Sequence, residues 1–536
     1  MSIEQTAGAP AHEASGGKHQ GSKSGADPKW WTLAAVCLGT FMLLLDITIV
    51  NVALPQIQDS LQSSFADLQW VVDAYALTLA SLLLTAGSLA DMYGRRRLYL
   101  VGLSLFTIAS ALCGAAQSSI MLELSRALQG VGGAITFSVS LALLANAFRG
   151  RERGTAFGIW GAITGIAVAI GPIVGGALVT GLSWRWIFFV NLPIGIIAVT
   201  LTFLRVQESR DPNARRPDWA GFALFTAALA SLVYALIESG RHGFSDDVVI
   251  GCFIAAAVLL VAFLIVEARG SHPMFDLGLF RLPTFSGGAV AAFGISAGIF
   301  SMLLYLTLYL QDVLQFSAMQ TGLRLLVLSG AILPVSALAG RLTSHVPIRV
   351  LIGPGLVVTG VGLLLMRGLD ASSSWTHLIP GMIVGGIGVG FVNPPLASTA
   401  VGVVPPQRAG MASGINSTFR QVGIATGIAL LGTLFSNRLA TAVVDDIAHT
   451  PLAGHGGAIS GALRNGEARS LFAHANSPQQ AALIDRVVRG AFTTALDEIL
   501  LVAAIVGIVC GVAAFVLIRS KDFVHVNPDE GAPAAG

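Results

Sequence analysis

The chain has 536 residues, of which 54% are hydrophobic and only 11% are charged, and its formal net charge is +2. A soluble domain carries about 25% charged residues because its surface faces water, so this apolar excess predicts a surface that faces lipid. The near-neutral balance excludes a nucleic-acid-binding domain, in which Lys and Arg cluster on one polar face.

Residues 1–29 are polar and lack the apolar core of a signal peptide, so we expect a disordered cytoplasmic tail. Apolar runs follow that are long enough to cross about 30 Å of hydrocarbon, which takes about 20 helical residues. An even number of spans puts both termini on one side of the membrane. The fourteen predicted spans are 30–53, 69–90, 98–116, 121–147, 155–178, 186–204, 218–238, 248–268, 285–310, 322–342, 349–367, 376–399, 410–435 and 494–518.

The basic residues predict which side the termini occupy. Twenty of the 31 Lys and Arg residues fall on the side of the N-terminus, whereas the short loops opposite hold only Arg185, Arg241 and Arg367. Short loops that lie in the cytoplasm carry an excess of Lys and Arg. We therefore expect a multi-pass cell-membrane protein with both termini in the cytoplasm. Residues 436–493 are predicted to form a long outer loop: a flexible cap, a short helical hairpin or a tolerated insertion.

Three ionisable residues fall at membrane depth in the first four spans: Asp46, Asp73 and Arg126. Such residues are costly in lipid and are therefore functional candidates. A movement of Arg126 away from either carboxyl would raise the pKa of that carboxyl, so that it binds a proton. Movement toward the carboxyl would lower its pKa and release the proton. The alternatives are that Asp46 is a structural hydrogen-bonding anchor and that Asp73 is a wet carboxylate at the interface.

Four motifs occupy matching places in the first six spans: "LDITIVNVALP" in the first, "GSLADMYGRRR" after the second, "RALQGVGGA" in the fourth and "GAITGIAVAIGPIVGG" in the fifth. Small residues about four apart permit close helix packing, and a proline inside a helix bends it. The tight glycine-rich loop after the second span places fixed charge at the membrane rim. Its candidate gating residues are Gly87, Asp91, Gly94, Arg95 and Arg96, and the candidate packing residues of the fifth span are Gly171, Pro172, Gly175 and Gly176.

Together these motifs, with "WRWIFFVNLPIG" and "QRAGMASGINSTFRQVG", resemble the major facilitator superfamily, specifically its fourteen-helix drug–proton antiporter branch. The resemblance covers residues 30–518 and implies an all-α polytopic membrane protein: the major facilitator fold with two six-helix halves and two inserted central helices. The implied parts are a cytoplasmic tail 1–29, an N-terminal bundle 30–204, an inserted pair with its flanking loops 205–284, a C-terminal bundle 285–518 and a second tail 519–536.

The resemblance implies a proton-coupled transporter that exports drugs or other small, often cationic or amphipathic, molecules by alternating access. It favours Asp46 as the membrane-embedded acid, Asp73 as its cation-facing partner, and "GPIVGG" as the antiporter signature. It also implies that Asp91 meets the N-terminus of the helix that begins near Ala409. The alternative for Asp91 is a salt bridge with Arg95 or Arg96 in its own loop.

Five aromatic residues and one arginine are candidates to line a central cavity, although each is as readily a packing residue: Trp160, Tyr305, Tyr309, Phe391, Phe419 and Arg420. The expected partners are a small-molecule substrate, protons and the lipid bilayer, for a monomer that binds no nucleic acid. The sequence contains no ATP-binding G-x-x-x-x-G-K-[ST] loop and no H-E-x-x-H metal motif. The four cysteines form no CxxC pair. We therefore expect no enzyme, cofactor or metal. The alternative function is export of an endogenous metabolite, natural product or lipid.

Overall fold

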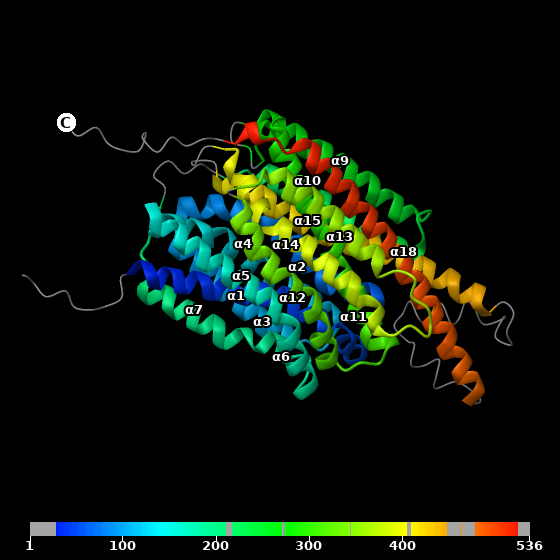
Figure 1. Ribbon diagram of the computed structural model, residues 1–536. Coiled ribbons are helices and arrows are strands. Elements are labelled where there is room, and N and C mark those ends of the chain that lie inside the picture. Colours follow the sequence, from blue (N-terminus) through cyan, green and yellow to red (C-terminus); the bar gives the residue numbers. More distant parts are fainter. Residues whose placement is uncertain are drawn as a thin grey trace, which may run out of the picture.

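The computed structural model describes residues 28–523 except 149, 211–216, 271–272, 274, 344, 405–408, 448–460 and 462–477. Long helices run side by side through this described part, which contains no strand (Figure 1). Within it, 13 helices are long and apolar enough to span a membrane. The bent pair Ile159–Val168 and Ile170–Gly181 makes a fourteenth. The predicted fourteen spans all correspond to these helices.

The first bundle is formed by the helices before residue 206. In it α1 packs against α5 and α7, and α4 packs against α2 and α3. The bounds are α1 (Pro28–Leu61), α2 (Phe65–Tyr93), α3 (Arg95–Gly114), α4 (Ser119–Ala147), α5 (Gly150–Gly181), α6 (Trp186–Phe189) and α7 (Asn191–Arg205).

The bend in α5 has a local cause. The two halves of this helix meet at 41° between Val168 and Ile170. Pro172 has no N–H to donate, and its ring clashes with the carbonyl four residues earlier, that of Val168. The bend predicted from Pro172 is therefore confirmed.

Two further helices, α8 (Trp219–His242) and α9 (Asp247–Arg269), form a hairpin. Helix α8 packs against both α2 and α15, so it covers one side of the contact between the two bundles. Helix α9 is the outermost, because its apolar side chains, such as Val258 at 61% exposure, face away from the protein. Lipid, in place of other helices, is expected to cover these apolar side chains.

The second bundle contains one span, residues 283–313, that includes two turns of π-helix. Helix α13 packs against α14 and α18, and α15 packs against α10 and α18. The bounds are η1 (Leu277–Arg281), α10 (Pro283–Ile295), η2 (Ser296–Phe300), α11 (Ser301–Leu308), η3 (Tyr309–Val313), α12 (Ala318–Leu342), α13 (Ile348–Leu365), η4 (Trp375–Leu378), α14 (Ile379–Gly402), α15 (Ala409–Ile447), α18 (Pro478–Leu517) and η7 (Ser520–Asp522).

The predicted outer loop 436–493 is helical at both of its ends. Helix α15 continues to Ile447 and α18 begins at Pro478. Buried Val443 on the first extension and Val487 on the second belong to one hydrophobic cluster, which stabilises helix beyond the membrane-length apolar runs. Residues 448–460 and 462–477 of that predicted loop lie outside the described residues.

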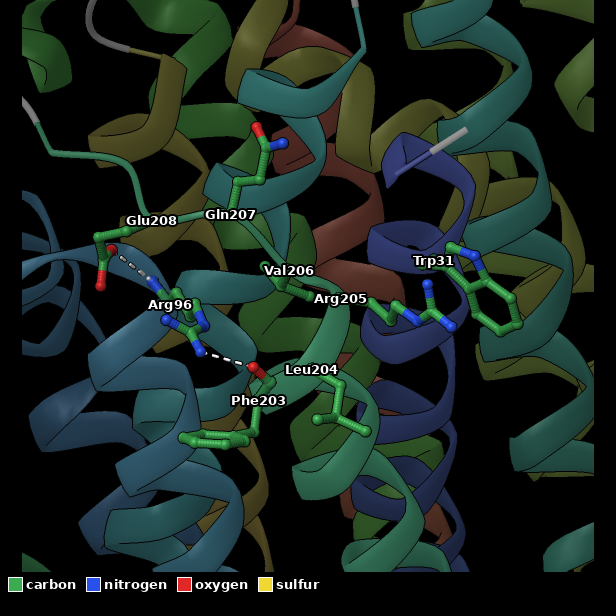
Figure 2. Close-up of a pocket in the computed structure, with 8 residues that line it drawn as sticks. All are labelled: Trp31, Arg96, Phe203, Leu204, Arg205, Val206, Gln207 and Glu208. Atoms are coloured by element: carbon green, nitrogen blue, oxygen red, sulfur yellow. Dashed lines mark hydrogen bonds between the residues drawn. The ribbon is translucent and has the colours of Figure 1, made fainter. Parts of the chain in front are cut away.

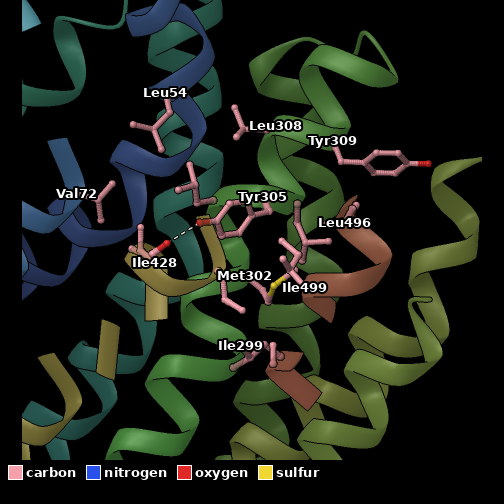
Figure 3. Packing of buried hydrophobic residues seen from close by; sticks show 14 of the residues in the cluster. Leu54, Val72, Ile299, Met302, Tyr305, Leu308, Tyr309, Ile428, Leu496 and Ile499 are labelled. Atoms are coloured by element: carbon pink, nitrogen blue, oxygen red, sulfur yellow. Dashed lines mark hydrogen bonds between the residues drawn. The ribbon is translucent and has the colours of Figure 1, made fainter. Parts of the chain in front are cut away.

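A large hydrophobic cluster joins the two bundles. Leu54 and Val72 of the first bundle lie near Tyr305, Ile428 and Leu496 of the second (Figure 3). Helices α1 and α5 begin together, since Lys29 and Glu152 form an ion pair of 3.0 Å. We call the end of the protein where α1 begins and α18 finishes the terminal end, and the opposite end the far end (Figure 1).

Candidate functional site

A buried ion pair lies inside the first bundle, formed by Asp46 of α1 and Arg126 of α4. The Nη1 of Arg126 is 2.5 Å from Oδ2 of Asp46, and the side chains of Arg126 and Asp46 are 1% and 0% exposed. The other carboxylate oxygen, Oδ1, accepts hydrogen bonds from Gln129 at 2.8 Å and from Asn191 at 3.0 Å. Ser110 accepts hydrogen bonds from both amides. We call Asp46, Ser110, Arg126, Gln129 and Asn191 the Asp46 cluster.

The guanidinium of Arg126 is equally well surrounded. Its Nε donates to the carbonyl of Val71 at 3.0 Å, and its Nη1 also donates to Oε1 of Gln129 at 2.7 Å. The ring of Tyr75 lies 4.3 Å from the guanidinium carbon, a cation–π distance. Buried ion pairs are tolerated when further hydrogen bonds satisfy both partners, and the Asp46 cluster meets that condition.

Three members of the Asp46 cluster, Ser110, Gln129 and Asn191, were not identified from the sequence. The residues predicted from the sequence were ionisable, aromatic, glycine or proline residues and included no amide or serine. A signal did exist, because Gln129 stands in "RALQG" and Asn191 in "FFVNLP", two of the motifs that carry the family resemblance. A carboxylate in lipid needs several donors, so polar residues in neighbouring apolar spans are the ones to test.

Asp73 has a different environment. Its side chain is 0% exposed, and both of its carboxyl oxygens are buried without a hydrogen-bond partner among the described residues. Its neighbours on the same face of α2 meet the second bundle: the amide of Gln69 donates to the carbonyl of Ile428 at 3.1 Å, and Ala76 packs in a cluster with Ala425. Asp73 therefore lies at the contact between α2 and α15.

Helix geometry separates Asp73 from Arg126. Arg126 contacts α2 through the carbonyl of Val71 and the ring of Tyr75. Residues two apart on an α-helix point about 200° apart at 3.6 residues per turn. Asp73 thus faces the second bundle while its neighbours Val71 and Tyr75 face Arg126. In this conformation Asp46 is the one carboxylate among the described residues that pairs with Arg126.

The glycine-rich loop between α2 and α3 makes its own salt bridge. Arg95 donates through Nη2 to Asp91 at 2.8 Å and through Nε at 3.0 Å. This salt bridge is the alternative predicted for Asp91. The other prediction, a contact with the N-terminus of the helix that begins near Ala409, involves the start of α15, and residues 405–408 directly before it lie outside the described residues. A Cβ added at Gly87 would meet Oγ of Ser138 at 3.0 Å, so this glycine permits the close approach of α2 and α4.

A residue outside the motif, Glu208, closes the same loop. Its carboxylate accepts hydrogen bonds from the backbone N–H groups of Arg96 at 3.0 Å and Arg97 at 3.2 Å, in the first turn of α3. A carboxylate is stabilising at that end of a helix. A Cβ on Gly94 would lie 2.7 Å from Glu208, and the φ of Gly94 is +109°, so only glycine fits there. Because Glu208 follows an apolar span by three residues, sequence pattern alone gave no reason to select it.

The glycines of α5 lie where three helices meet near the far end. Gly171 and Gly175 contact Thr48 and Ile49 of α1, with a Cβ at Gly175 placed 2.9 Å from Ile49. A Cβ at Gly176 would lie 2.7 Å from backbone atoms of α12. The carbonyl of Pro172 in turn approaches Gly322 of α12. The predicted close-packing role of this motif includes a contact between the two bundles.

Toward the terminal end, α5 and α12 no longer touch so closely. A Cβ at Gly165 would first meet Leu333 at 3.5 Å. A Cβ at Gly161 of α5, or at Gly330 or Gly340 of α12, would meet nothing within 4 Å. The α5–α12 contact is therefore tight at the far end and loose at the terminal end.

The candidate cavity residues divide into two groups. Tyr305 and Tyr309 are fully buried, and their hydroxyls donate to the carbonyls of Ile428 at 2.7 Å and Ser373 at 3.4 Å. They are packing residues in this conformation (Figure 3). The others are half-buried, namely Trp160, Phe391, Phe419 and Arg420.

Contacts with neighbouring helices position two of the half-buried residues, Trp160 and Arg420. The indole of Trp160 donates to Thr40 at 3.0 Å. The guanidinium of Arg420 lies 6.0 Å from the ring of Phe300. Helix α15, which carries Arg420, packs against α2, α8, α10, α14 and α18.

The family model described as Major Facilitator Superfamily matches residues 36–428. The chain is 42% identical to "Multidrug resistance protein Stp" of Mycobacterium tuberculosis over 76% of this chain and 75% of that protein. It is 32% identical to "Tetracenomycin C resistance and export protein" of Streptomyces glaucescens over 97% of this chain and 96% of that protein.

A solved structure has the same fold. It is a bacterial homologue of the human lysosomal transporter Spinster, in an inward-facing and occupied conformation, with a TM-score of 0.65. The alignment covers 94% of this chain and 100% of the other at 16% identity. The fold class predicted from the sequence is confirmed by these matches.

Proposed function

This chain belongs to the Major Facilitator Superfamily, and we propose that it exports drugs and other small amphipathic molecules in exchange for protons. Several relatives carry names that specify resistance or export, including the multidrug resistance protein Stp and the puromycin resistance protein of Streptomyces alboniger, which is 37% identical over 78% of this chain. The proposal transfers that activity to this chain.

Proton coupling is supported by one observation above all, the isolation of Asp73. A buried carboxylate without a cation or a hydrogen-bond donor is costly when ionised. We therefore assign Asp73 as a proton-carrying group that is neutral in this conformation. Asp46, by contrast, is stabilised as an anion by Arg126 and two amides.

In the proposed transport cycle, a proton moves from the outer medium to the Asp73 carboxyl while the far end is open. It is released to the cytoplasm after the terminal end has opened, and the ionised Asp73 then faces a cationic substrate. The Asp46 cluster supplies a fixed charge pair within the first bundle. Exchange of one proton for one monovalent cation moves no net charge, so the pH gradient drives it. With a neutral substrate, the inward charge adds about 2.3 kcal/mol per 100 mV of membrane potential.

Alternating access is supported by the uneven contact between α5 and α12. We place the termini, and hence the terminal end, in the cytoplasm because Lys and Arg accumulate on that side. The conformation described here is then closed to the outside and poised to open inward. Residues 30–204 and 285–518 act as the two moving halves of a monomer, and the α8–α9 pair covers their contact.

A natural-product exporter is a second candidate, favoured by the relative that matches nearly the whole chain. That protein is named for resistance to, and export of, tetracenomycin C. Another relative is named as a probable actinorhodin transporter of Streptomyces coelicolor, at 35% identity over 80% of this chain. Both candidates use the same proton cycle and differ in cargo only.

Transport by the purified protein in proteoliposomes tests the proposal. We expect an imposed pH gradient to drive accumulation of a fluorescent cationic dye on the acidic side, and an electroneutral proton–potassium exchanger to abolish it. Transport that persists at full rate after the gradient is collapsed would refute proton coupling. A panel of cationic dyes and neutral aromatic polyketides separates the two candidate cargoes.

A further inference from the structure

A cavity of about 420 Å³ opens on the outer surface of the first bundle at the terminal end. It lies between the start of α1, the start of α3 and the end of α7 (Figure 2). Trp31, Arg96 and the segment 203–208 line it. Trp31 and Arg205 have no part in the transport cycle proposed above, whereas Arg96 and Glu208 also support the glycine-rich loop between α2 and α3.

The cavity contains one cation, Arg205, that has no acidic partner among the described residues. The guanidinium of Arg205 lies 5.3 Å from the ring centre of Trp31, and no acidic partner holds it among the described residues. Its basic neighbours at this rim are paired: Lys29 with Glu152, and Arg97 with Glu208. Arg205 therefore leaves an uncompensated positive charge in a partly enclosed space.

The second guanidinium of the cavity makes the site more favourable for an anion. Arg96 donates through Nη2 to the carbonyl of Phe203 at 2.6 Å (Figure 2). The last carbonyls of a helix carry partial negative charge, and Arg96 neutralises that charge at the end of α7. An anion in the cavity would then meet Arg205 without opposition from the helix end.

The side of the cavity that faces the bilayer is apolar. Phe203 and Leu204 are 62% and 66% exposed, and Ile196 and Ile197 continue this exposed face along α7. Tryptophan concentrates where hydrocarbon meets head groups, and Trp31 stands at that level beside Arg205. The cavity thus combines a cation at head-group depth with a surface for acyl chains.

We propose that this cavity binds the head group of an anionic glycerophospholipid. The guanidinium of Arg205 binds the phosphate, for which its planar set of donors is suited, the indole of Trp31 packs against the glycerol region, and one acyl chain lies along Phe203 and Leu204. The volume falls within the range of small-molecule pockets, roughly 300–1,000 Å³. Basic pockets between helices on the cytoplasmic side are suited to such lipids.

Occupancy of the site has a structural consequence. Arg96 and Glu208 form the wall of the cavity and also hold the start of α3 against the end of α7. A lipid seated there reinforces that contact, which supports the glycine-rich loop between α2 and α3. The lipid composition of the membrane would in this way affect the stability of the first bundle.

Thermal unfolding of the full chain in detergent, with lipid added, tests this proposal. We expect phosphatidylglycerol to raise the unfolding midpoint of the unmodified protein more than phosphatidylcholine does. In Arg205→Gln, the phosphatidylglycerol concentration at half effect should rise about fivefold, which corresponds to about 1 kcal/mol per basic residue at a membrane surface. Arg205→Lys should retain most of the effect.

Arg269→Gln is the matched control, because Arg269 is also the last residue of an outer helix at the terminal end. It should leave the response to phosphatidylglycerol unchanged. An equal loss in both variants would mean general attraction to the basic rim, and an unchanged response in Arg205→Gln would likewise reject the site. Inorganic phosphate is the last arm: stabilisation by phosphate alone, equal to that by the lipid, would identify a free-anion site and overturn the lipid assignment.

Discussion

Arg126 and Asp46 are paired at 2.5 Å inside the first bundle, on helices α4 and α1. The same guanidinium reaches α2 only at the carbonyl of Val71 and the ring of Tyr75. Asp46 and Asp73 therefore have separate environments. Asp46 has a full set of partners, and Asp73 has none among the described residues.

Loss of one member of the ion pair should be more harmful than loss of both. Asp46→Asn or Arg126→Gln leaves a buried charge uncompensated, which costs roughly 3–5 kcal/mol. The double variant removes both charges and should recover a substantial part of that loss. Unfolding midpoints of the three purified variants measure this, and a double variant whose loss equals the sum of the two single losses would contradict it.

Asp73→Asn should abolish transport driven by a pH gradient while leaving stability nearly unchanged, because the amide replaces a carboxyl group that has no partner. Asp67→Asn on the same helix is the matched control. Asp67 lies in the first turn of α2 and accepts a hydrogen bond from the Ser64 N–H at 2.8 Å. Its neutralisation should cost about 0.3–1 kcal/mol and preserve transport. Unimpaired pH-driven transport by Asp73→Asn would remove this residue from the mechanism.

Gly176→Ala should impair export by forcing α5 and α12 apart at the far end, since its Cβ would lie 2.7 Å from the α12 backbone. The amide of Met319 donates to Thr180 at 3.1 Å across this contact. In a cysteine-free background, Thr180→Cys should react faster with an impermeant thiol reagent when Gly176→Ala is also present than when Gly176 is retained.

Gly161→Ala provides the control on the same helix, because its Cβ would meet nothing within 4 Å. Alanine is favoured over glycine in a helix by about 0.5–1 kcal/mol, so this variant should export normally and be slightly more stable. Equal export by the two variants would show that the far-end contact is not part of the cycle.

Gly94→Ala should reduce export, because the new Cβ would push Glu208 away from the start of α3. Gly94 and Gly243 both have positive φ, +109° and +86°, so alanine at either position is strained by about 1–3 kcal/mol. Only Gly94 contacts Glu208, whereas a Cβ at Gly243 would meet nothing within 4 Å. Similar stability losses with reduced transport in Gly94→Ala alone is the expected pattern, and reduced transport in both variants would assign the effect to strain.

The spans could be predicted because hydropathy is a local property of the chain. Runs such as 30–53 and 494–518 must lie in hydrocarbon whatever their neighbours are. The bend at Pro172 was equally local, since it depends on the missing N–H of one residue. The helical extensions to Ile447 and from Pro478 lie in the predicted outer loop, for which a short helical hairpin was one of three alternatives. Hydropathy could not decide between them, because cross-helix packing stabilises these extensions.

The partners of the candidate site residues could not be predicted from the sequence, for a different reason. Depth along a helix follows from counting residues, but the direction of a side chain depends on how each helix is rotated against its neighbours. Two residues of sequence, between Val71 and Asp73, are enough to turn α2 from the face that meets Arg126 to the face that meets α15. Glu208 likewise acquires its role only where the end of α7 meets the start of α3.

The amino-acid sequence by itself determined the class of this protein, its fourteen spans and the few acids that lie at membrane depth. These follow from the cost of charge and the requirement for apolar length in lipid. The tertiary structure alone decided that Arg126 neutralises Asp46 and that Asp73 stays isolated at the contact between the bundles. Pairing is a property of helices assembled at fixed rotations, and no single span contains that information.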